Sequence, residues 1–254
     1  MNNKYFSINR EGCSIRCTLY FNDPNAITQV VLCCHGFGGN KENKAALRLA
    51  QKVLHKRNDV SFLAFDWPCH GQDARKKLDL DDCDRYLTLV TDYARSELGA
   101  QTLFVFATSF GAYLTLKYIS EHENPFCKIA LRSAAVRMYE VLDDDNIMTP
   151  KERESLEKGK DILVGFSRKI RITKQFADSL IAADITKRSY TTFSDRMILI
   201  HGTKDEIVPI APVWEFAEEN HIPFFPIENA DHRFVDAGKM EEATMDVVRF
   251  FWSE

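Results

Sequence analysis

The sequence predicts a mostly parallel, doubly wound α/β fold of about eight strands with an inserted cap. Short apolar runs alternate with longer stretches of helical pattern along most of the chain, and this alternation is typical of a parallel sheet covered by helices. The length of 254 residues and the hydrophobic share of 45% suit one large domain with a substantial core. One long interval, residues 133–195, interrupts the alternation and predicts the cap.

The chain opens with two polar–apolar stretches, residues 4–8 and 14–21, which we expect to pair as an antiparallel hairpin at the edge of the sheet. Later runs that are apolar on both faces predict buried parallel strands at residues 30–34, 60–65, 102–107, 127–131, 197–200 and 222–227. Stretches of helical pattern predict helices at residues 41–56, 81–98, 110–121, 212–220 and 239–251.

The long interval has local structure signals of its own. The Thr-Pro-Lys-Glu sequence at 149–152 has the spacing of a capping box, with proline at the first helical position. Residues 162–166 and 169–172 are expected to form a hairpin, and Thr173 to cap a helix that runs through Ala183.

We therefore expect the core to comprise residues 1–132 and 196–254, with residues 133–195 as an inserted cap, or lid, of the same single domain. A disordered charged loop is the alternative for the inserted residues. We expect the cap to cover the edge of the sheet where the parallel strands end, because open α/β sheets carry their active sites there.

Charge and cysteine content narrow the class of protein. With Lys plus Arg at 33 and Asp plus Glu at 37, the net charge is -4, which disfavours binding to nucleic acid. No apolar run approaches the roughly 18 residues of a membrane span, and the first ten residues lack the core of a signal peptide. Seven cysteines without a CxxC pair are typical of reduced, mostly buried thiols. We expect a cytoplasmic protein.

A candidate nucleophile follows the third buried strand. Ser109 lies between this strand and a predicted helix, and a serine on such a tight turn needs small residues two positions away on either side. Ala107 and Gly111 occupy those positions. The usual pattern is G-x-S-x-G, and Ala107 departs from it by one methyl group, which the turn should tolerate. The alternative is a serine that simply caps the helix.

A nucleophilic serine needs a base, and the base needs an orienting acid. When the serine occupies such a turn, the acid follows it in the chain and the histidine comes last. Asp205 and His232 fit this order, since each follows a predicted strand. Asp231 is a poor alternative acid, because an adjacent residue cannot easily turn its carboxylate onto its neighbour's ring. Glu206 is a weak substitute for Asp205.

The remaining histidines fail the same test. His221 lies before the last strand, at the wrong edge of the sheet. The others precede Asp205 in the chain: His35, His55, His70, His122 and His201.

A glycine-rich loop, His-Gly-Phe-Gly-Gly at 35–39, follows the first buried strand. Its glycines let the backbone turn and bring N–H groups toward a reacting carbonyl, whose oxyanion needs such donors. Taken alone, this loop is also compatible with an ordinary turn or a phosphate loop, although it lacks the GK[ST] ending of the latter.

Together, the HGFGG loop, Ser109, Asp205 and His232 resemble the α/β-hydrolase superfamily of serine hydrolases over nearly the whole chain. The resemblance implies an α/β-hydrolase fold and an oxyanion hole formed by the backbone N–H groups of Phe37 and Phe110. The segment 66–72 resembles the family's D-x-x-G-x-G loop, from which Cys69 and His70 depart.

Those two departures have alternative interpretations. A structural role is expected for His70, since no cluster of His, Asp or Glu with metal-ligand spacing surrounds it. Cys69 is a candidate reactive thiol beside the site. No metal or nucleotide cofactor is expected, because serine, imidazole and backbone N–H groups complete the chemistry.

Within the superfamily, the chain looks most similar to small esterases that cleave hydroxycinnamoyl esters, with monoacylglycerol lipases and lysophospholipases close in pattern. The resemblance implies a carboxylic ester hydrolase that works through an acyl-serine. A serine hydrolase of thioester, peptide or C–C bonds is the main alternative, and a non-catalytic binding protein is the weakest.

The expected substrate is a small neutral aryl or short to medium acyl ester, because the residues around the site are mostly apolar or aromatic. Trp67, Tyr139 and Phe166 are the expected substrate-binding residues, with Leu163 and Phe176 also facing the pocket. Arg132 ends a strand near the site, and we expect it to pair with an acid of the cap, within the Asp run at 143–145.

Overall fold

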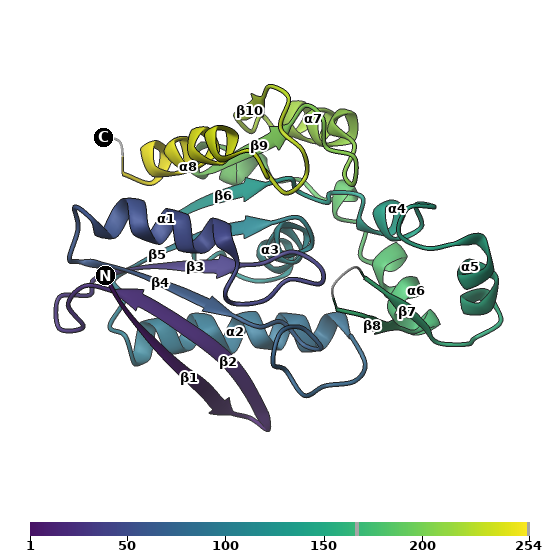
Figure 1. Ribbon diagram of the computed structural model, residues 1–254, viewed down its shortest axis with the longest axis horizontal. Coiled ribbons are helices and arrows are strands. Elements are labelled where there is room, and N and C mark those ends of the chain that lie inside the picture. Colours follow the sequence, from purple (N-terminus) through teal and green to yellow (C-terminus); the bar gives the residue numbers. More distant parts are fainter. Residues whose placement is uncertain (166–167, 253–254) are drawn as a thin grey trace.

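The computed structural model describes residues 1–165 and 168–252, and its centre is an eight-stranded sheet (Figure 1). The strands follow the order β1-β2-β4-β3-β5-β6-β9-β10 across the sheet. Their bounds are β1 Asn2–Arg10, β2 Cys13–Phe21, β3 Gln29–Cys34, β4 Val60–Phe65, β5 Thr102–Thr108, β6 Lys128–Arg132, β9 Met197–Gly202 and β10 Phe224–Ile227.

The sheet is parallel except at one edge. β1 pairs antiparallel with β2, and β2 pairs antiparallel with β4, whereas the pairs from β4 through β10 are parallel. Every residue of β4 is buried, which explains why that strand has no alternating pattern in the sequence. The predicted edge hairpin and doubly wound α/β-hydrolase fold are confirmed.

Helices cover both faces of the sheet. One face carries α1 (Lys44–Leu54) and α8 (Ala237–Trp252), which contact each other. The other carries α2 (Leu80–Ser96), α3 (Phe110–Glu121) and α7 (Ile210–Glu219).

Two apolar clusters fill the spaces between the sheet and these helices. Cys33 belongs to the cluster under α1 and α8, and its neighbour Cys34 to the cluster under α2 and α3. Successive side chains of a strand point to opposite faces, so both faces of β3 need apolar residues.

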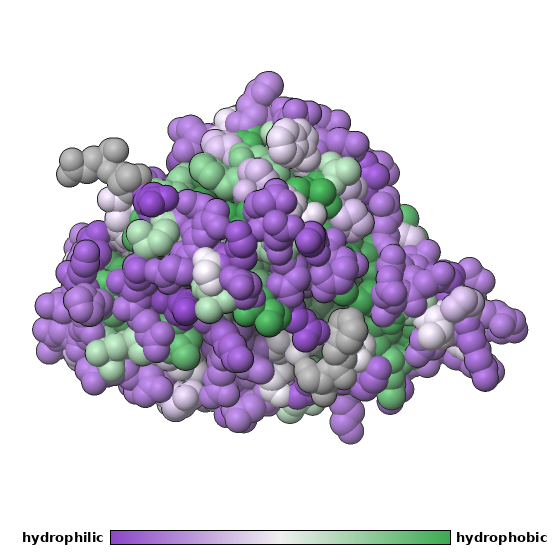
Figure 2. Space-filling view, turned by 45° about the horizontal axis from the view of Figure 1, so that its top comes forward, coloured by the Kyte–Doolittle hydropathy of each residue, from purple (hydrophilic) through white to green (hydrophobic). Residues whose placement is uncertain are grey.

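Most of the inserted residues 133–195 form a separate group of short elements beyond the carboxyl ends of the parallel strands (Figure 1). These are α4 (Met138–Leu142), α5 (Pro150–Glu157), β7 (Ile162–Val164), β8 (Ile170–Ile172) and α6 (Lys174–Ala182). Two 3₁₀ turns, η1 (Ile185–Lys187) and η2 (Thr191–Arg196), then lead the chain back to the start of β9. β7 and β8 pair as an antiparallel hairpin. Figure 2 shows apolar side chains reaching the surface along the seam between this group and the core.

Side-chain caps explain where the helices of the inserted segment begin. Thr149 accepts a hydrogen bond from the amide of Glu152, whose carboxylate accepts one from the amide of Thr149 in return. Thr173 accepts one from the amide of Phe176 at the start of α6. Both caps satisfy N–H groups that the first turn of a helix leaves free. The predicted capping box and the start of the later helix are confirmed.

Among the helices of the described residues, none is both long and apolar enough to span a bilayer.

Candidate active site

Ser109 occupies a strained turn between β5 and α3. Its φ is 52° and its ψ is -118°, a backbone conformation that side chains rarely adopt. Gly111 makes the turn possible, since a Cβ atom there would lie 2.5 Å from the carbonyl oxygen of Cys34. Ala107, which departs from the expected pattern, lies fully buried in β5. The Ser109 side chain makes no capping hydrogen bond to α3, so the helix-capping alternative is wrong.

Ser109, His232 and Asp205 form one hydrogen-bonded chain. The Ser109 Oγ lies 3.1 Å from His232 Nε2, and His232 Nδ1 lies 2.8 Å from Asp205 Oδ2. A carboxylate can only accept, so Nδ1 must carry the ring proton of a neutral His232. Nε2 is then free to accept the hydroxyl proton of Ser109. This is the order that a serine nucleophile, its base and its orienting acid require.

The carboxylate of Asp205 is fully buried and held in place from several sides. It accepts hydrogen bonds from the amides of Ile207, at 3.0 Å, and Val208, at 2.8 Å. Burial alone would raise the pKa of Asp205, but the hydrogen bonds and the proximity of His232 outweigh it and leave the pKa below its usual value. Asp205 therefore stays ionised and fixes the imidazole tautomer.

A second histidine contacts the same carboxylate. His201 Nε2 donates to the carbonyl of Val208 at 2.9 Å and lies 3.3 Å from Asp205 Oδ2. Burial lowers the pKa of His201, so the ring is neutral. Sequence reasoning excluded His201 as the base by chain order and missed this contact, although its position four residues before Asp205 is a usable signal.

The two acids considered as alternatives to Asp205 make contacts with the backbone instead. Asp231 Oδ1 accepts a hydrogen bond from the amide of Val235 at 2.8 Å, and Glu206 Oε2 lies 3.5 Å from the backbone nitrogen of His232. Among the acids of the described residues, Asp205 is the one whose carboxylate pairs with the His232 ring.

The HGFGG loop passes directly beside Ser109. A Cβ atom on Gly36 would lie 3.1 Å from the Cβ of Ser109, so the absence of a side chain permits this close approach. The amides of Phe37 and Phe110 donate no hydrogen bond to any atom of the described residues. Phe110 is the first residue of α3, where an N–H has no partner within the helix. Both N–H groups are therefore available to an oxyanion.

The loop after β4 supports the glycine-rich loop. Asp66 accepts hydrogen bonds from the amides of Lys41, at 2.7 Å, and Gln72, at 2.8 Å, and so ties the two loops together. Gly71 is required here, because a Cβ atom would lie 2.1 Å from the Asp66 carboxylate. This explains the aspartate and the glycine of the D-x-x-G-x-G resemblance.

His70 and Cys69 are structural. His70 is fully buried, donates through Nδ1 to the carbonyl of Pro68 at 2.8 Å and stacks on Phe110. Cys69 is also buried, and burial raises the pKa of its thiol to about 12. A thiol of that acidity carries almost no thiolate at neutral pH, so the reactive-thiol interpretation fails.

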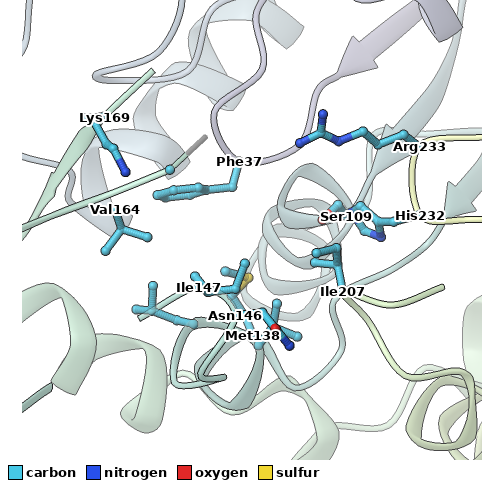
Figure 3. A pocket seen from close by; sticks show the side chains of 13 residues that line it. Phe37, Ser109, Met138, Asn146, Ile147, Val164, Lys169, Ile207, His232 and Arg233 are labelled. Atoms are coloured by element: carbon cyan, nitrogen blue, oxygen red, sulfur yellow. Dashed lines mark hydrogen bonds between the residues drawn. The ribbon is translucent and has the colours of Figure 1, made fainter. Parts of the chain in front are cut away.

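An apolar cavity of about 180 Å³ adjoins Ser109 on the side of the inserted segment. Figure 3 shows Ser109 and His232 on one side of it, Val164 and Lys169 on the other, and Phe37 between them. Six of its thirteen lining residues are aliphatic: Met138, Val141, Leu142, Ile147, Val164 and Ile207. α4 and β7 therefore supply much of the wall of a cavity that contains Ser109.

Most of the residues predicted to contact the substrate lie away from the cavity beside Ser109, so that prediction is mostly wrong. Trp67 is fully buried and donates its indole N–H to the carbonyl of His35, so it stabilises the loop instead of lining a cavity. Tyr139 lines a different cavity, beside α6. Phe176 is buried in the core, and Leu163 is 52% exposed on the outer side of β7. Phe166 lies outside the described residues.

A second cavity, of about 510 Å³, adjoins Ser109 on the side of α1 and α8. Arg132 and Lys44 line it, and Arg233 lines both cavities. Lys169 adds a fourth cation, in the apolar cavity. No Asp or Glu is found among the described residues that line either cavity. The surroundings of Ser109 are thus positively charged, although the whole chain carries a net charge of -4.

Arg132 does not pair with an acid of the inserted segment, so that expectation is wrong. Two of those acids pair instead with Arg153 of the same segment, which lies 2.6 Å from Asp143 and 3.1 Å from Asp145. Arg132 instead places its guanidinium 4.8 Å from the ring centre of Phe234, in the second cavity.

No group of three or more His, Cys, Asp or Glu side chains that could hold a metal ion occurs in residues 1–165 and 168–252.

A sequence-family comparison agrees with this geometry. The model of the family described as serine aminopeptidase, S33, matches residues 25–151, which is half of the chain and includes the HGFGG loop and Ser109. The chain belongs to the serine aminopeptidase S33 family. No curated protein sequence matches the chain.

Solved structures that resemble this S33-family chain share its fold along almost the full length. Est1E from Butyrivibrio proteoclasticus, with ferulic acid bound, superposes with a TM-score of 0.76 at 17% identity, covering 97% of each chain. Alpha/beta hydrolase domain-containing protein 10 from mouse gives 0.70 at 14% identity, covering 98% of each chain. Dienelactone hydrolase from Anabaena variabilis gives 0.64 at 16% identity, covering 98% of this chain and 96% of that one. The S33-family chain is therefore a serine hydrolase of the α/β-hydrolase type.

Proposed function

We propose that the protein is a serine esterase that cleaves carboxylic esters with short to medium acyl groups through an acyl-serine intermediate. The observation that carries the proposal is the hydrogen-bonded chain from Ser109 through His232 to Asp205, next to two free backbone N–H groups and an apolar cavity. The site then has every group that the reaction needs: a nucleophile, a base, an orienting acid, oxyanion donors and a pocket for the acyl group.

In the proposed mechanism, Ser109 Oγ attacks the ester carbonyl while its proton passes to His232 Nε2. Asp205 stabilises the resulting imidazolium, and the N–H groups of Phe37 and Phe110 bind the oxyanion. Collapse of the intermediate breaks the carbonyl–oxygen bond, and His232 gives its proton to the leaving alkoxide. Water then repeats the sequence on the acyl-serine and releases the acid.

The aliphatic wall of the cavity supports an aliphatic acyl group, since burial of apolar surface stabilises binding by about 25 cal/mol per Å² and requires no polar partner. A hydroxycinnamoyl group is the second candidate, supported by the likeness to Est1E, whose structure holds ferulic acid. Monoacylglycerols and lysophospholipids carry longer acyl chains, which a cavity of about 180 Å³ disfavours.

A peptidase acting at free amino termini fits less well, despite the family description. The α-ammonium of such a substrate needs a carboxylate or other acceptor near the scissile bond. The cavities beside Ser109 offer Lys and Arg side chains and, among their described lining residues, no Asp or Glu. The charge around the site therefore favours esters over aminoacyl substrates.

A hydrolase panel tests the proposal. The purified protein is assayed with p-nitrophenyl esters of rising chain length, methyl cinnamates, acyl thioesters and aminoacyl amides, and its active serine is titrated with a fluorophosphonate. We expect kcat/KM to be highest for esters of short to medium chains, with aminoacyl amides inert. Hydrolysis of the amides or thioesters in preference to every ester would refute the proposal.

The same proposal includes a small-molecule substrate, no metal or nucleotide cofactor and a cytoplasmic location. The seven cysteines are unpaired, and six of them are buried, which supports a reducing compartment. Activity should survive exhaustive dialysis against EDTA. A loss that zinc restores would contradict the expected absence of a metal.

A further inference from the structure

Arg132 is a buried cation beside the candidate nucleophile, and it makes no ion pair with an acid among the described residues. It ends β6, is 7% exposed and lines the same cavity as Ser109 and His232. Its Nη1 donates to the thioether sulfur of Met240 at 3.1 Å, and its Nε has no partner among the described residues. A thioether is a weak acceptor, so most of the guanidinium's hydrogen-bonding capacity remains unused.

Two carboxylates act on Arg132 without forming an ion pair with it among the described residues. Asp205 and Asp231 act on Arg132 electrostatically, but neither comes within 4.0 Å to form an ion pair in the described structure. Both carboxylates already accept hydrogen bonds elsewhere, from His232 and Val235 respectively. Burial lowers the pKa of Arg132 to about 10, so the side chain is still a cation at neutral pH.

An arginine buried in this way normally requires an ionised partner, because a desolvated charge without one is costly. Its planar fork of donors matches the oxygens of a carboxylate or a phosphate. Lys44 lines the same cavity and adds positive charge, and no Asp or Glu is found among the described residues that line it. The cavity thus has the charge and the donors of an anion site next to Ser109.

We propose that the Arg132 cavity binds an anionic group, a carboxylate or a phosphate, carried by the leaving group of the ester substrate. This rests on the proposed esterase function. The apolar cavity on the other side of Ser109 is suited to the acyl group, so the cavity that remains receives the alcohol half. His232 lines both cavities and can give its proton to the leaving oxygen between them.

The rival explanation is that Arg132 only packs the loop that carries His232, through its contact with Phe234. The two roles make different predictions. A packing role affects all substrates alike, whereas an anion-binding role depends on the charge of the leaving group.

Three butanoyl esters of para-substituted phenols, compared between variants and the wild type for each ester separately, distinguish these roles. They are 4-(butanoyloxy)benzoate, 4-(butanoyloxy)phenyl phosphate and, as the neutral control, methyl 4-(butanoyloxy)benzoate. kcat/KM is measured for the wild type, Arg132→Met, which keeps an apolar stem, and Arg132→Lys, which keeps the charge. Lys44→Met tests the exposed rim of the same cavity. The ratio between the carboxylate and the phosphate ester tells which anion fits better.

We expect the wild type to prefer the anionic esters and Arg132→Met to lower their kcat/KM by at least about tenfold. The neutral ester should change by less than about threefold, and Arg132→Lys should retain part of the preference. Equal losses for all three esters, or a wild type that favours the neutral ester, would overturn the inference. Failure of the wild type to cleave any of the three would instead count against the esterase function.

Salt dependence provides a readout that needs no variant, should Arg132→Met fail to fold. Raising the ionic strength from about 0.05 M to about 0.5 M should reduce kcat/KM for the anionic esters and leave the neutral ester almost unchanged, because salt screens the attraction to the cationic cavity. The same salt response for all three esters would contradict the proposal.

Discussion

A Cβ atom on Gly111 would lie 2.5 Å from the carbonyl oxygen of Cys34, at the end of the neighbouring strand. It would also lie 2.6 Å from the carbonyl oxygen of His35. Both oxygens belong to the backbone, so neither can move without shifting the HGFGG loop. This one position therefore couples the turn that presents Ser109 to the loop that holds the Phe37 amide.

The first prediction follows from this contact. Gly111→Ala should displace the loop or α3 and reduce kcat by roughly 10² or more, since small misplacements of reacting groups have effects of that size. The matched control is Ala107→Gly, which restores the usual first glycine in β5 and should leave kcat within about threefold. Steady-state kinetics on p-nitrophenyl butyrate measure both. Equal activity of the two variants would contradict the role given to Gly111.

The second prediction concerns the acyl cavity and uses two neighbours on β7. Val164 is buried in the cavity wall, whereas Leu163 is 52% exposed on the opposite side of the strand. Val164→Phe should fill part of the cavity and shift the preferred acyl chain to a shorter length. Leu163→Phe adds a ring at the neighbouring position and should leave the chain-length profile unchanged. A profile that responds to Leu163→Phe instead would place the acyl group elsewhere.

The third prediction concerns stability against pH. Burial lowers the pKa of His70 to about 3, whereas a histidine in an unfolded chain titrates near 6.5. Between these values the unfolded state binds the proton and the folded state does not, so the free energy of unfolding decreases as the pH falls through this window. From pH 7 to pH 5, His70 should contribute a loss of about 2 kcal/mol.

Urea denaturation of the wild type and His70→Asn at both pH values measures this contribution. The Asn amide can replace Nδ1 as a donor to the carbonyl of Pro68, but it does not titrate. The variant should therefore lose less stability than the wild type on acidification. An identical loss in both proteins would show that His70 does not stay neutral when folded.

Much of the fold could be predicted from the sequence because its signals are local. The Thr149 and Thr173 caps, the apolar strands and the strand-to-helix turn at Ser109 each depend on a few adjacent residues. The order of Ser109, Asp205 and His232 along the chain was also sufficient to select the three residues that the structure brings together.

The walls of the cavities could not be predicted in the same way, because they depend on contacts between distant residues. Trp67 is aromatic and close to the site in sequence, yet its indole is directed to the carbonyl of His35. The sequence predicts an ion pair between Arg132 and an acid of the inserted segment, but Arg153, which lies close to those acids in the sequence, pairs with Asp143 and Asp145. Which side of β7 faces the cavity depends on how the β7–β8 hairpin packs against the rest of the protein, and the sequence of the strand alone does not determine that packing.

The central claim is that Ser109 and His232 act together as nucleophile and base, and double-mutant kinetics test it most directly. kcat for p-nitrophenyl butyrate is measured for Ser109→Ala, His232→Ala and the double variant, with thermal unfolding as a check that each is folded. We predict a loss of roughly 10⁴ to 10⁶ in each single variant and little further loss in the double variant, because the residues work as a unit. A folded Ser109→Ala variant that keeps more than about a tenth of the wild-type kcat would contradict the account.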